Sequence, residues 1–443
     1  MSLFTTLHTG ASGLGVSSTF LSVVGDNIAN INTTGYKQSR ATFADFLPQD
    51  VFGLNGSSQV GTGAGTAGVS TLFGQGTLEA TDSSTDMAIN GNGFFIVKNG
   101  TDQYYTRSGA FGVDDSGYLV NDAGMKLQGY SAQAGSISAA LGDIKINTAG
   151  MAGSATSTIS LDATLSADED VNDDLSALDF YGTGTGANTL TDAADAADFS
   201  TSVTVYDSLG VGHDVTVLFE RTSDADWSWR AVTDASAVYD STGAQYSTTE
   251  NTAFEMASGT ISFDTDGNPT AFAQTDTAGY TFLGTATPAI TFDFGIDTTG
   301  AATDGDLRMV GETSAVSSIA QDGYSAGSLS SVEVDIEGTI TGSYSNGEQV
   351  TLGQVALATF DSTAGLERVG GTLFEATTAA GDPAIGIAGT GGRGTIAGNA
   401  LEQSNVELED QFVAMITAQR TYQANSKVIS TVNETLANLM QLL

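Results

Sequence analysis

The chain begins and ends with apolar side chains at the spacing of a helix. Over residues 3–31 and again from residue 408 to the end, they recur in steps of four and three, which places them along one helical face. We expect the two terminal helices to pair with each other and to leave apolar surface for other copies of the chain. The stripe residues are Leu3, Leu7, Leu14, Leu21, Ile28, Leu408, Phe412, Met415, Tyr422, Ile429, Leu436 and Leu443.

The two predicted helices differ in how well their sequences support them. Four glycines fall inside the first helix, and each costs about 1 kcal/mol relative to alanine. The first helix is therefore not expected to persist alone in water. The last helix has a marked start, because Ser404 and Glu407 have the spacing of a capping box.

Between the helices the pattern changes to alternating apolar and polar residues interrupted by turn signals. Asn-Gly and Ser-Gly pairs separate short runs between residues 84 and 148, and the same texture returns over 329–390, as in successive β-hairpins. Residues 150–317 contain further hairpin patterns. The sequence predicts a mainly β fold with terminal α-helices, in which the chain runs out and back and a second β domain is inserted in the first.

A length of 443 residues exceeds one ordinary core. We expect four parts, the first three of which are each built from two separate segments. They are a coiled-coil-like helical inner domain (1–31 and 404–443), a connector (32–70 and 391–403), a middle β domain (71–148 and 320–390) and an inserted acidic outer β domain (149–319).

Charge narrows the choice of partners. The formal net charge is −39, and residues 151–317 hold 27 acidic residues against three arginines and no lysine. Nucleic-acid binding and anionic membrane surfaces are disfavoured, because both require basic patches. No run approaches the ~20 apolar residues of a membrane span, so no membrane insertion is expected. No basic residue precedes Lys37, so the chain either stays in the cytosol or is exported without a cleaved signal.

Several short motifs resemble catalytic or ligand-binding signatures but lack the neighbouring elements or residues that those functions need. GAGTAG at 63–68 lacks the strand and helix that a dinucleotide site needs. GYSAG around Ser325 has no histidine downstream. Two histidines and no cysteine leave little for a transition metal, and DTDGN at 264–268 is typical of a β-turn. We predict no enzyme activity, no cofactor and no catalytic or metal-ligating residue; calcium stays open, because oxygen ligands suffice for it.

Residues 26–37, DNIANINTTGYK, resemble the N-terminal signature of the bacterial flagellar rod and hook protein family. In that family an apolar helix is followed by Asn, Thr, Gly, an aromatic residue and Lys at fixed spacing. The matching residues here are Asn30, Thr33, Gly35, Tyr36 and Lys37.

Three further stretches carry the same resemblance, in the family's order. DMAINGNGFFIV at 86–97 and YTRSGAFGVDDSGYLVNDAGMKLQGY at 105–130 resemble the shared β domain, and GTIAGNALEQSNVELEDQFVAMITAQRTYQANSKVI at 394–429 resembles the C-terminal signature. Rod proteins usually lack a large central insertion. Residues 150–317, followed by QDGYSAGSL and TLGQVALATF, resemble hook proteins instead.

The resemblance implies a structural subunit of the flagellar hook at the cell exterior. Copies would polymerise helically into a curved hollow tube, a flexible joint transmitting torque from rod to filament, with the terminal helices lining its channel. Its implied partners are other copies of itself, the rod, hook-cap and hook–filament junction proteins, and the flagellar type III export apparatus. Two alternatives remain: a distal rod protein of the basal body, or, from another class, a calcium-dependent extracellular adhesin or surface-layer protein.

The motif also suggests why the apolar stripe stops at residue 31. Asn and Gly tolerate the left-handed conformation that ends a helix, so either Asn30 or Asn32 is expected to supply the cap. For Lys37 and Arg40 two interpretations stand. They anchor the connector against carboxylates of neighbouring copies, or they are solvated charges.

Overall fold

We describe a computed structural model of the chain, covering residues 3–53, 56–133, 135–147, 150–182, 186, 188–240, 242–277, 279–282, 290–296 and 307–441. The chain divides into two compact units. Unit 1 comprises 1–148, 330–343 and 349–443, and unit 2 comprises 149–329 and 344–348. The expected fold class, mainly β with terminal helices in contact with each other, is confirmed.

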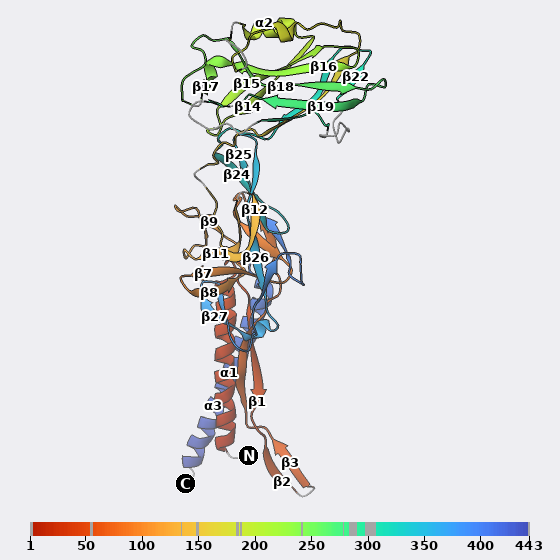
Figure 1. The fold of residues 1–443 in the computed structure, drawn as a ribbon. Coiled ribbons are helices and arrows are strands. Elements are labelled where there is room, and N and C mark those ends of the chain that lie inside the picture. Colours follow the sequence, from red (N-terminus) through yellow and green to blue (C-terminus); the bar gives the residue numbers. More distant parts are fainter. Residues whose placement is uncertain are drawn as a thin grey trace. The chain divides into compact units, whose positions relative to one another are not determined.

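Unit 1 carries both long helices, which lie side by side (Figure 1). Strands β1 and β4 pair as an antiparallel ribbon, β2 pairs with β3, and a larger sheet has the order β24-β25-β26-β11-β7-β8-β28-β27. Its elements are α1 (Leu3–Ala29), β1 (Ser39–Asp45), β2 (Gln49–Gly53), β3 (Gly56–Val60), β4 (Ala64–Thr71), β5 (Leu78–Ala80), β6 (Met87–Asn90), β7 (Phe94–Asn99), β8 (Asp102–Thr106), β9 (Gly112–Val113), β10 (Leu119–Val120), β11 (Lys126–Gln133), β12 (Ser136–Asp143), β24 (Leu329–Val334), β25 (Thr339–Tyr344), β26 (Gln349–Thr359), η3 (Thr363–Gly365), β27 (Leu366–Gly370), β28 (Leu373–Ala376), β29 (Ala384–Ile387), β30 (Thr395–Gly398), β31 (Ala400–Glu402) and α3 (Leu408–Gln441).

Unit 2 is built from a five-stranded antiparallel sheet, β14-β15-β16-β18-β19, and a sheet in which β13 pairs with β21, β22 and β23. Strand β13 runs parallel to β21 and β22. Its elements are β13 (Thr158–Ser166), η1 (Leu175–Ala177), α2 (Leu190–Ala196), β14 (Phe199–Tyr206), β15 (Gly212–Arg221), β16 (Asp226–Asp234), η2 (Ala235–Ala237), β17 (Val238–Asp240), β18 (Ala253–Phe263), β19 (Pro269–Asp276), β20 (Tyr280–Phe282), β21 (Thr291–Asp293), β22 (Arg308–Val310) and β23 (Ala315–Gln321).

Alternation along the strands builds the core of unit 2. In β16 the side chains of Trp227, Trp229 and Ala231 are fully buried, while the residues between them are only half-buried. The buried side chains join Leu161 of β13 and Phe292 of β21 in one apolar cluster. This is the period-two pattern of a strand with one face on a core.

Two sequence expectations shift at the helix ends. Helix α1 ends at Ala29, two residues before the end of its apolar stripe. The proposed capping box at the start of the last helix does not form. The Ser404 hydroxyl accepts a hydrogen bond from the Val406 N–H, and α3 begins only at Leu408.

The DTDGN stretch is the turn between β18 and β19, where Asp264 Oδ1 accepts from the N–H groups of Asp266 and Asn268.

Candidate functional site

The two terminal helices pack antiparallel at close range. Near the end of α1, Asn27 Nδ2 donates to Gln411 Oε1 at 3.1 Å, near the start of α3. Earlier in α1, a Cβ built on Gly13 would lie 2.6 Å from Asn425 Nδ2, and one built on Gly10 would lie 3.0 Å from Ile429 Cγ1. Two of the glycines that weaken α1 in isolation therefore let the backbone approach α3 closely.

Helix α3 has two unlike faces. The face toward α1 carries small or half-buried residues, among which Ala418 is 2% exposed and Val432 is 8% exposed. On a helical projection, Phe412, Val413 and Ile416 lie on the other side, and their side chains are 46%, 65% and 52% exposed. We call these three residues the outer α3 face. Exposed apolar groups of this size mark an interaction surface when they cluster.

The predicted stripe is therefore only partly the face that contacts α1. In α3 the contact with α1 runs through Ala418, Asn425 and Val432, which are not stripe residues, and also through the stripe residue Ile429. The stripe side chains in the described part of the chain differ in how exposed they are. Half-buried are Leu7, Leu14, Leu21, Ile28, Met415, Ile429 and Leu436; exposed are Leu408, Phe412 and Tyr422; the side chain of Leu3 and residue Leu443 lie outside the described part.

The family motif forms the turn that follows α1. The Asn30 amide nitrogen Nδ2 donates back to Asp26 O at 2.8 Å, and its Oδ1 accepts from the Thr33 hydroxyl at 3.2 Å. The Thr33 carbonyl then accepts from the Tyr36 N–H at 3.2 Å. Asn30 thus closes the helix through its side chain, and the left-handed residue of the turn is Gly35, with φ of 70°.

Gly35 is held where no side chain fits. Its N–H donates to Glu402 O at 2.7 Å, and a Cβ at this position would lie 2.8 Å from the carbonyl carbon of Arg107. We predict that Gly35→Ala destabilises unit 1 by about 2–3 kcal/mol, because a strained φ is combined with a backbone clash. Thermal denaturation followed by circular dichroism measures this. Gly100→Ala is the control, because φ is also positive there but the space is open; equal losses would contradict the clash argument.

Tyr36 ties the turn to α1. Its hydroxyl donates to Asp26 Oδ2 at 2.9 Å, and the Arg368 guanidinium carbon lies 4.8 Å from its ring centroid. Burial, and next the hydrogen bond to Asp26, raise the pKa of Tyr36, which therefore stays a neutral donor. Beneath it, Asn27 Oδ1 accepts from the Ser39 N–H at 2.8 Å, and Asn27 Nδ2 donates to Ser39 O at 2.9 Å.

Lys37 lies in a buried ion cluster. Its Nζ donates to Glu402 Oε1 at 2.6 Å and to Gly74 O at 2.8 Å, and Arg107 lies 3.3 Å from Glu402 Oε2. The Lys37 and Glu402 side chains are 0% exposed. Burial lowers the pKa of Lys37 and of Arg107, and the Glu402 carboxylate opposes both shifts. The expectation that Lys37 is a solvated charge is therefore wrong, and its carboxylate partner is in the same chain.

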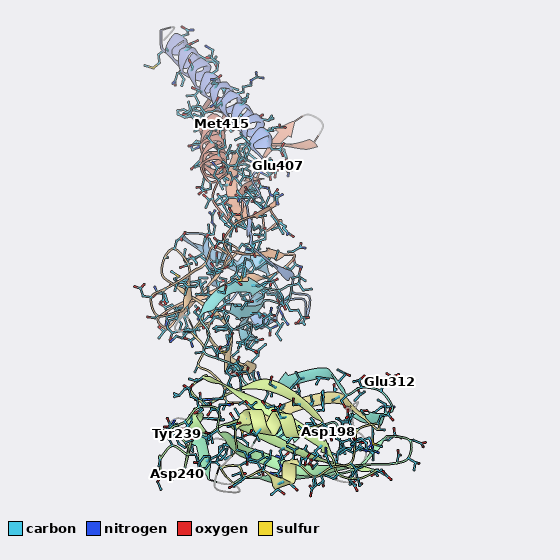
Figure 2. The ribbon with its side chains drawn as sticks, turned by 90° about the horizontal axis from the view of Figure 1, so that it is seen from above. Asp198, Tyr239, Asp240, Glu312, Glu407 and Met415 are labelled. Carbon is cyan, nitrogen blue, oxygen red and sulfur yellow. The ribbon has the colours of Figure 1, made fainter. Side chains whose placement is uncertain are left out.

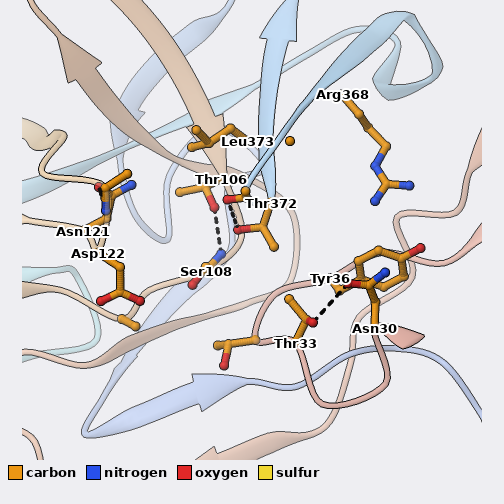
Figure 3. A pocket seen from close by; sticks show the side chains of 15 residues that line it. Asn30, Thr33, Tyr36, Thr106, Ser108, Asn121, Asp122, Arg368, Thr372 and Leu373 are labelled. Carbon is orange, nitrogen blue, oxygen red and sulfur yellow. Dashed lines mark hydrogen bonds between the residues drawn. The ribbon is translucent and has the colours of Figure 1, made fainter. Parts of the chain in front are cut away.

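A cavity of about 510 Å³ opens beside the motif. Asn30, Thr33 and Tyr36 line it from the turn, facing Arg368 from β27 (Figure 3). The Thr106 hydroxyl accepts from the Ser108 N–H on another wall. Most of its lining residues are polar or glycine.

Sequence reasoning missed the residues that complete this region. Glu402, Arg107 and Asn27 are buried polar side chains that no local periodicity singles out. Glu402 can be sought only once the structure shows that Lys37 is buried, since a buried Lys requires a paired carboxylate.

The other motifs and residues considered for catalysis form ordinary structural contacts in the described part of the chain. GAGTAG lies largely in β4, which pairs with β1. Ser325 O accepts from Asn346 Nδ2, and His213 stacks on Phe282. The described part of the chain contains no cluster of three or more His, Cys, Asp or Glu able to hold a metal ion. None of its helices is long and apolar enough to cross a membrane.

Four family models match in chain order and define the class of the protein as axial proteins of the flagellum. Their descriptions are Flagella basal body rod protein at 7–37, Flagellar hook protein FlgE/F/G D1 domain at 88–164, Flagellar basal body protein FlaE D2 domain at 174–324 and Flagellar basal body rod FlgEFG protein C-terminal at 397–442.

Full-length relatives narrow the class to one family. The flagellar hook protein FlgE of Escherichia coli (strain K12) is 34% identical, covering 97% of this chain and 98% of the relative. That of Treponema pallidum (strain Nichols) is 31% identical, covering 98% and 99%. The crystal structure of Helicobacter pylori flagellar hook protein FlgE2 covers 73% of this chain and 100% of its own at 14% identity and a TM-score of 0.49. The chain belongs to the flagellar hook protein FlgE family, a structural and non-enzymatic one.

Proposed function

We propose that this chain polymerises helically into the curved, hollow flagellar hook and acts as a flexible joint that transmits torque from rod to filament. The observation that carries the proposal beyond family membership is the outer α3 face. Phe412, Val413 and Ile416 are about half exposed or more in the single chain, on the side of the helix turned away from α1. Burying such a face against other copies gives an open helical assembly when the contact is heterologous and does not close.

Each part of the nested chain has its own place in the proposed tube. The inner domain (1–31 and 404–443) lines the channel, the connector (32–70 and 391–403) and the middle β domain (71–148 and 320–390) form the wall, and the acidic domain (149–319) lies outermost. In the inner domain, Leu408, Phe412 and Tyr422 are the stripe residues that other copies cover. The motif from Asn30 to Lys37 holds the base of the helix pair, and its part in assembly is to fix the direction in which α1 leaves the β structure.

The partners beyond other copies are the flagellar rod, the hook cap, the hook–filament junction proteins and the flagellar export apparatus. A distal rod protein remains the second candidate, since the matches at both ends of the chain are to models described for rod proteins as well. The match of residues 174–324 and the full-length hook relatives favour the hook.

Electron microscopy of the polymerised, purified chain tests the proposal. We expect hollow tubes that are curved in at least part of the preparation, with helical symmetry and the terminal helices at the inner wall. Uniformly straight, stiff tubes would favour the distal rod. A chain that stays monomeric at millimolar concentration and moderate salt would contradict both.

A further inference from the structure

Three lysines gather on one side of the sheet in unit 1. The β7–β11 register places Lys98 directly opposite Lys126. The Nζ atoms of Lys126 and Lys145 lie 3.6 Å and 5.4 Å from the centroid of the Tyr118 ring. We call Lys98, Lys126 and Lys145 the lysine patch. It stands out in a chain with 13 basic residues in 443 and a net charge of −39.

One member of the patch is neutralised within the chain. Lys126 Nζ pairs with Asp143 Oδ2 at 3.1 Å, and Gln128 Nε2 donates to Asp143 Oδ1 at 2.8 Å. Burial alone would raise the pKa of Asp143, but these hydrogen bonds and the charges of Lys126 and Lys98 lower it. Asp114 is a second carboxylate close enough to act on Lys126.

The other two members have no ion-pair partner within the described part of the chain. Lys98 and Lys145 are exposed, and among the described residues neither amine is within ion-pair distance of a carboxylate. Like charges directly opposite each other on neighbouring strands destabilise a sheet. Asp143 offsets this repulsion between Lys98 and Lys126 within the chain, whereas Lys98 and Lys145 stay exposed and available to an anionic partner.

The complementary surface lies in the same sequence. Residues 151–317 carry 27 acidic residues and three arginines. Two of these arginines are turned inward, since the side chains of Arg221 and Arg230 are only 12% and 20% exposed. The acidic groups are spread over unit 2, and Asp240 and Glu312 lie at opposite ends of it in Figure 2. Opposite potentials of this kind steer association and fix register.

We propose that the lysine patch docks on the acidic unit 2 of a second copy of this chain. The proposal rests on the proposed polymerisation and names one of its contacts. A second copy is favoured over other anionic partners, because each copy brings both surfaces and the contact can repeat without closing.

Zero-length crosslinking identifies the contact. Polymer assembled from equal amounts of ¹⁴N- and ¹⁵N-labelled chains is treated with a carbodiimide, which joins amines to carboxylates in direct contact, and is digested for mass spectrometry. We expect mixed-isotope crosslinks from Lys98 or Lys145 to carboxylates within 149–329. Crosslinks from these lysines only within one chain, or only to carboxylates elsewhere in a neighbour, would overturn the proposal.

A matched pair of variants tests the energetic role. Lys98→Gln/Lys145→Gln removes two positive charges. Ser362→Glu/Ala364→Glu adds two negative charges at exposed positions near the Phe94 end of β7, away from Lys98, so the net charge changes equally. At low salt we expect the lysine variant to polymerise on the order of tenfold more slowly, with weakened salt dependence, and the control to stay within about twofold of wild type.

The outcomes separate the docking contact from the proposed polymerisation. Wild-type chains that form tubes, with a lysine variant that matches them in rate and salt dependence, overturn the docking contact alone. Wild-type chains that form no tubes overturn the proposed function, and the contact with it.

Discussion

Replacing Glu402 with glutamine should lower the free energy of unfolding of unit 1 by about 3–5 kcal/mol. Glu402 accepts hydrogen bonds from Lys37 Nζ at 2.6 Å and from the Gly76 N–H at 2.8 Å, and it pairs with Arg107 at 3.3 Å. The glutamine has the same shape but no charge, so two buried cations lose their counter-ion. Charged groups without a partner in the interior carry a large desolvation cost. Lys37→Met should cost less, because Glu402 keeps Arg107 as its partner.

The two units allow the loss to be localised. Both tryptophans of the chain, Trp227 and Trp229, lie in unit 2, so tryptophan fluorescence follows that unit and circular dichroism follows both. We expect the unfolding midpoint of unit 1 to fall by roughly 10 °C while the tryptophan transition stays in place. Glu407→Gln is the matched control, since Glu407 is exposed, and it should change stability by less than about 0.5 kcal/mol. A Glu402→Gln chain that melts like wild type would refute a structural role for the buried cluster.

Ile416→Asp should abolish polymerisation and leave the monomer intact. The Ile416 side chain is 52% exposed on the outer α3 face, so in the single chain an aspartate there remains solvated. In the polymer the same carboxylate would be buried without a partner, at a cost of several kcal/mol in every subunit. We expect the concentration needed for assembly to rise at least hundredfold. The free energy of unfolding of the monomer, obtained from its melting curve, should change by less than about 0.5 kcal/mol.

Ala418→Asp is the informative comparison, two residues along the same helix. Ala418 is 2% exposed on the face toward α1, so its replacement should loosen the helix pair in the monomer itself. Sedimentation measures assembly, and circular dichroism measures helix content and melting, on the same preparations. If Ile416→Asp assembles normally, or if it melts the monomer as Ala418→Asp does, the outer α3 face is not the assembly surface.

Leu436 and Phe412 belong to the same apolar stripe but differ in their surroundings. On sequence alone Leu436 is a stripe position equal to Phe412. In the structure it is half-buried, seven and four residues beyond the α1-facing positions Ile429 and Val432 along the same side of α3. An aspartate at Leu436 would therefore disturb the helix pair as well as any contact between copies, and the two effects could not be separated.

The sequence by itself determined the features that rest on local patterns. The 4–3 stepping of apolar residues defined α1 and α3 to within a few residues, and alternation with Asn-Gly and Ser-Gly turns defined the β structure between them. Local chemistry also marked the motif turn, but the expectation of a left-handed Asn30 or Asn32 is wrong, because Gly35 is the residue with the positive φ that only glycine adopts without strain. Composition alone made residues 151–317 acidic, whatever their fold.

Tertiary structure alone decided which distant groups meet. Small side chains such as Ala418 mark a close helix contact but weigh little in an apolar pattern, so the stripe in α3 included the α1-facing Ile429 and missed Ala418. Lys37 and Glu402 are 365 residues apart, and no periodicity links them. Their pairing follows from the shape in which the two ends of the chain pack, because burial forces each charge to find a partner, while the sequence between them carries no record of which partner that is.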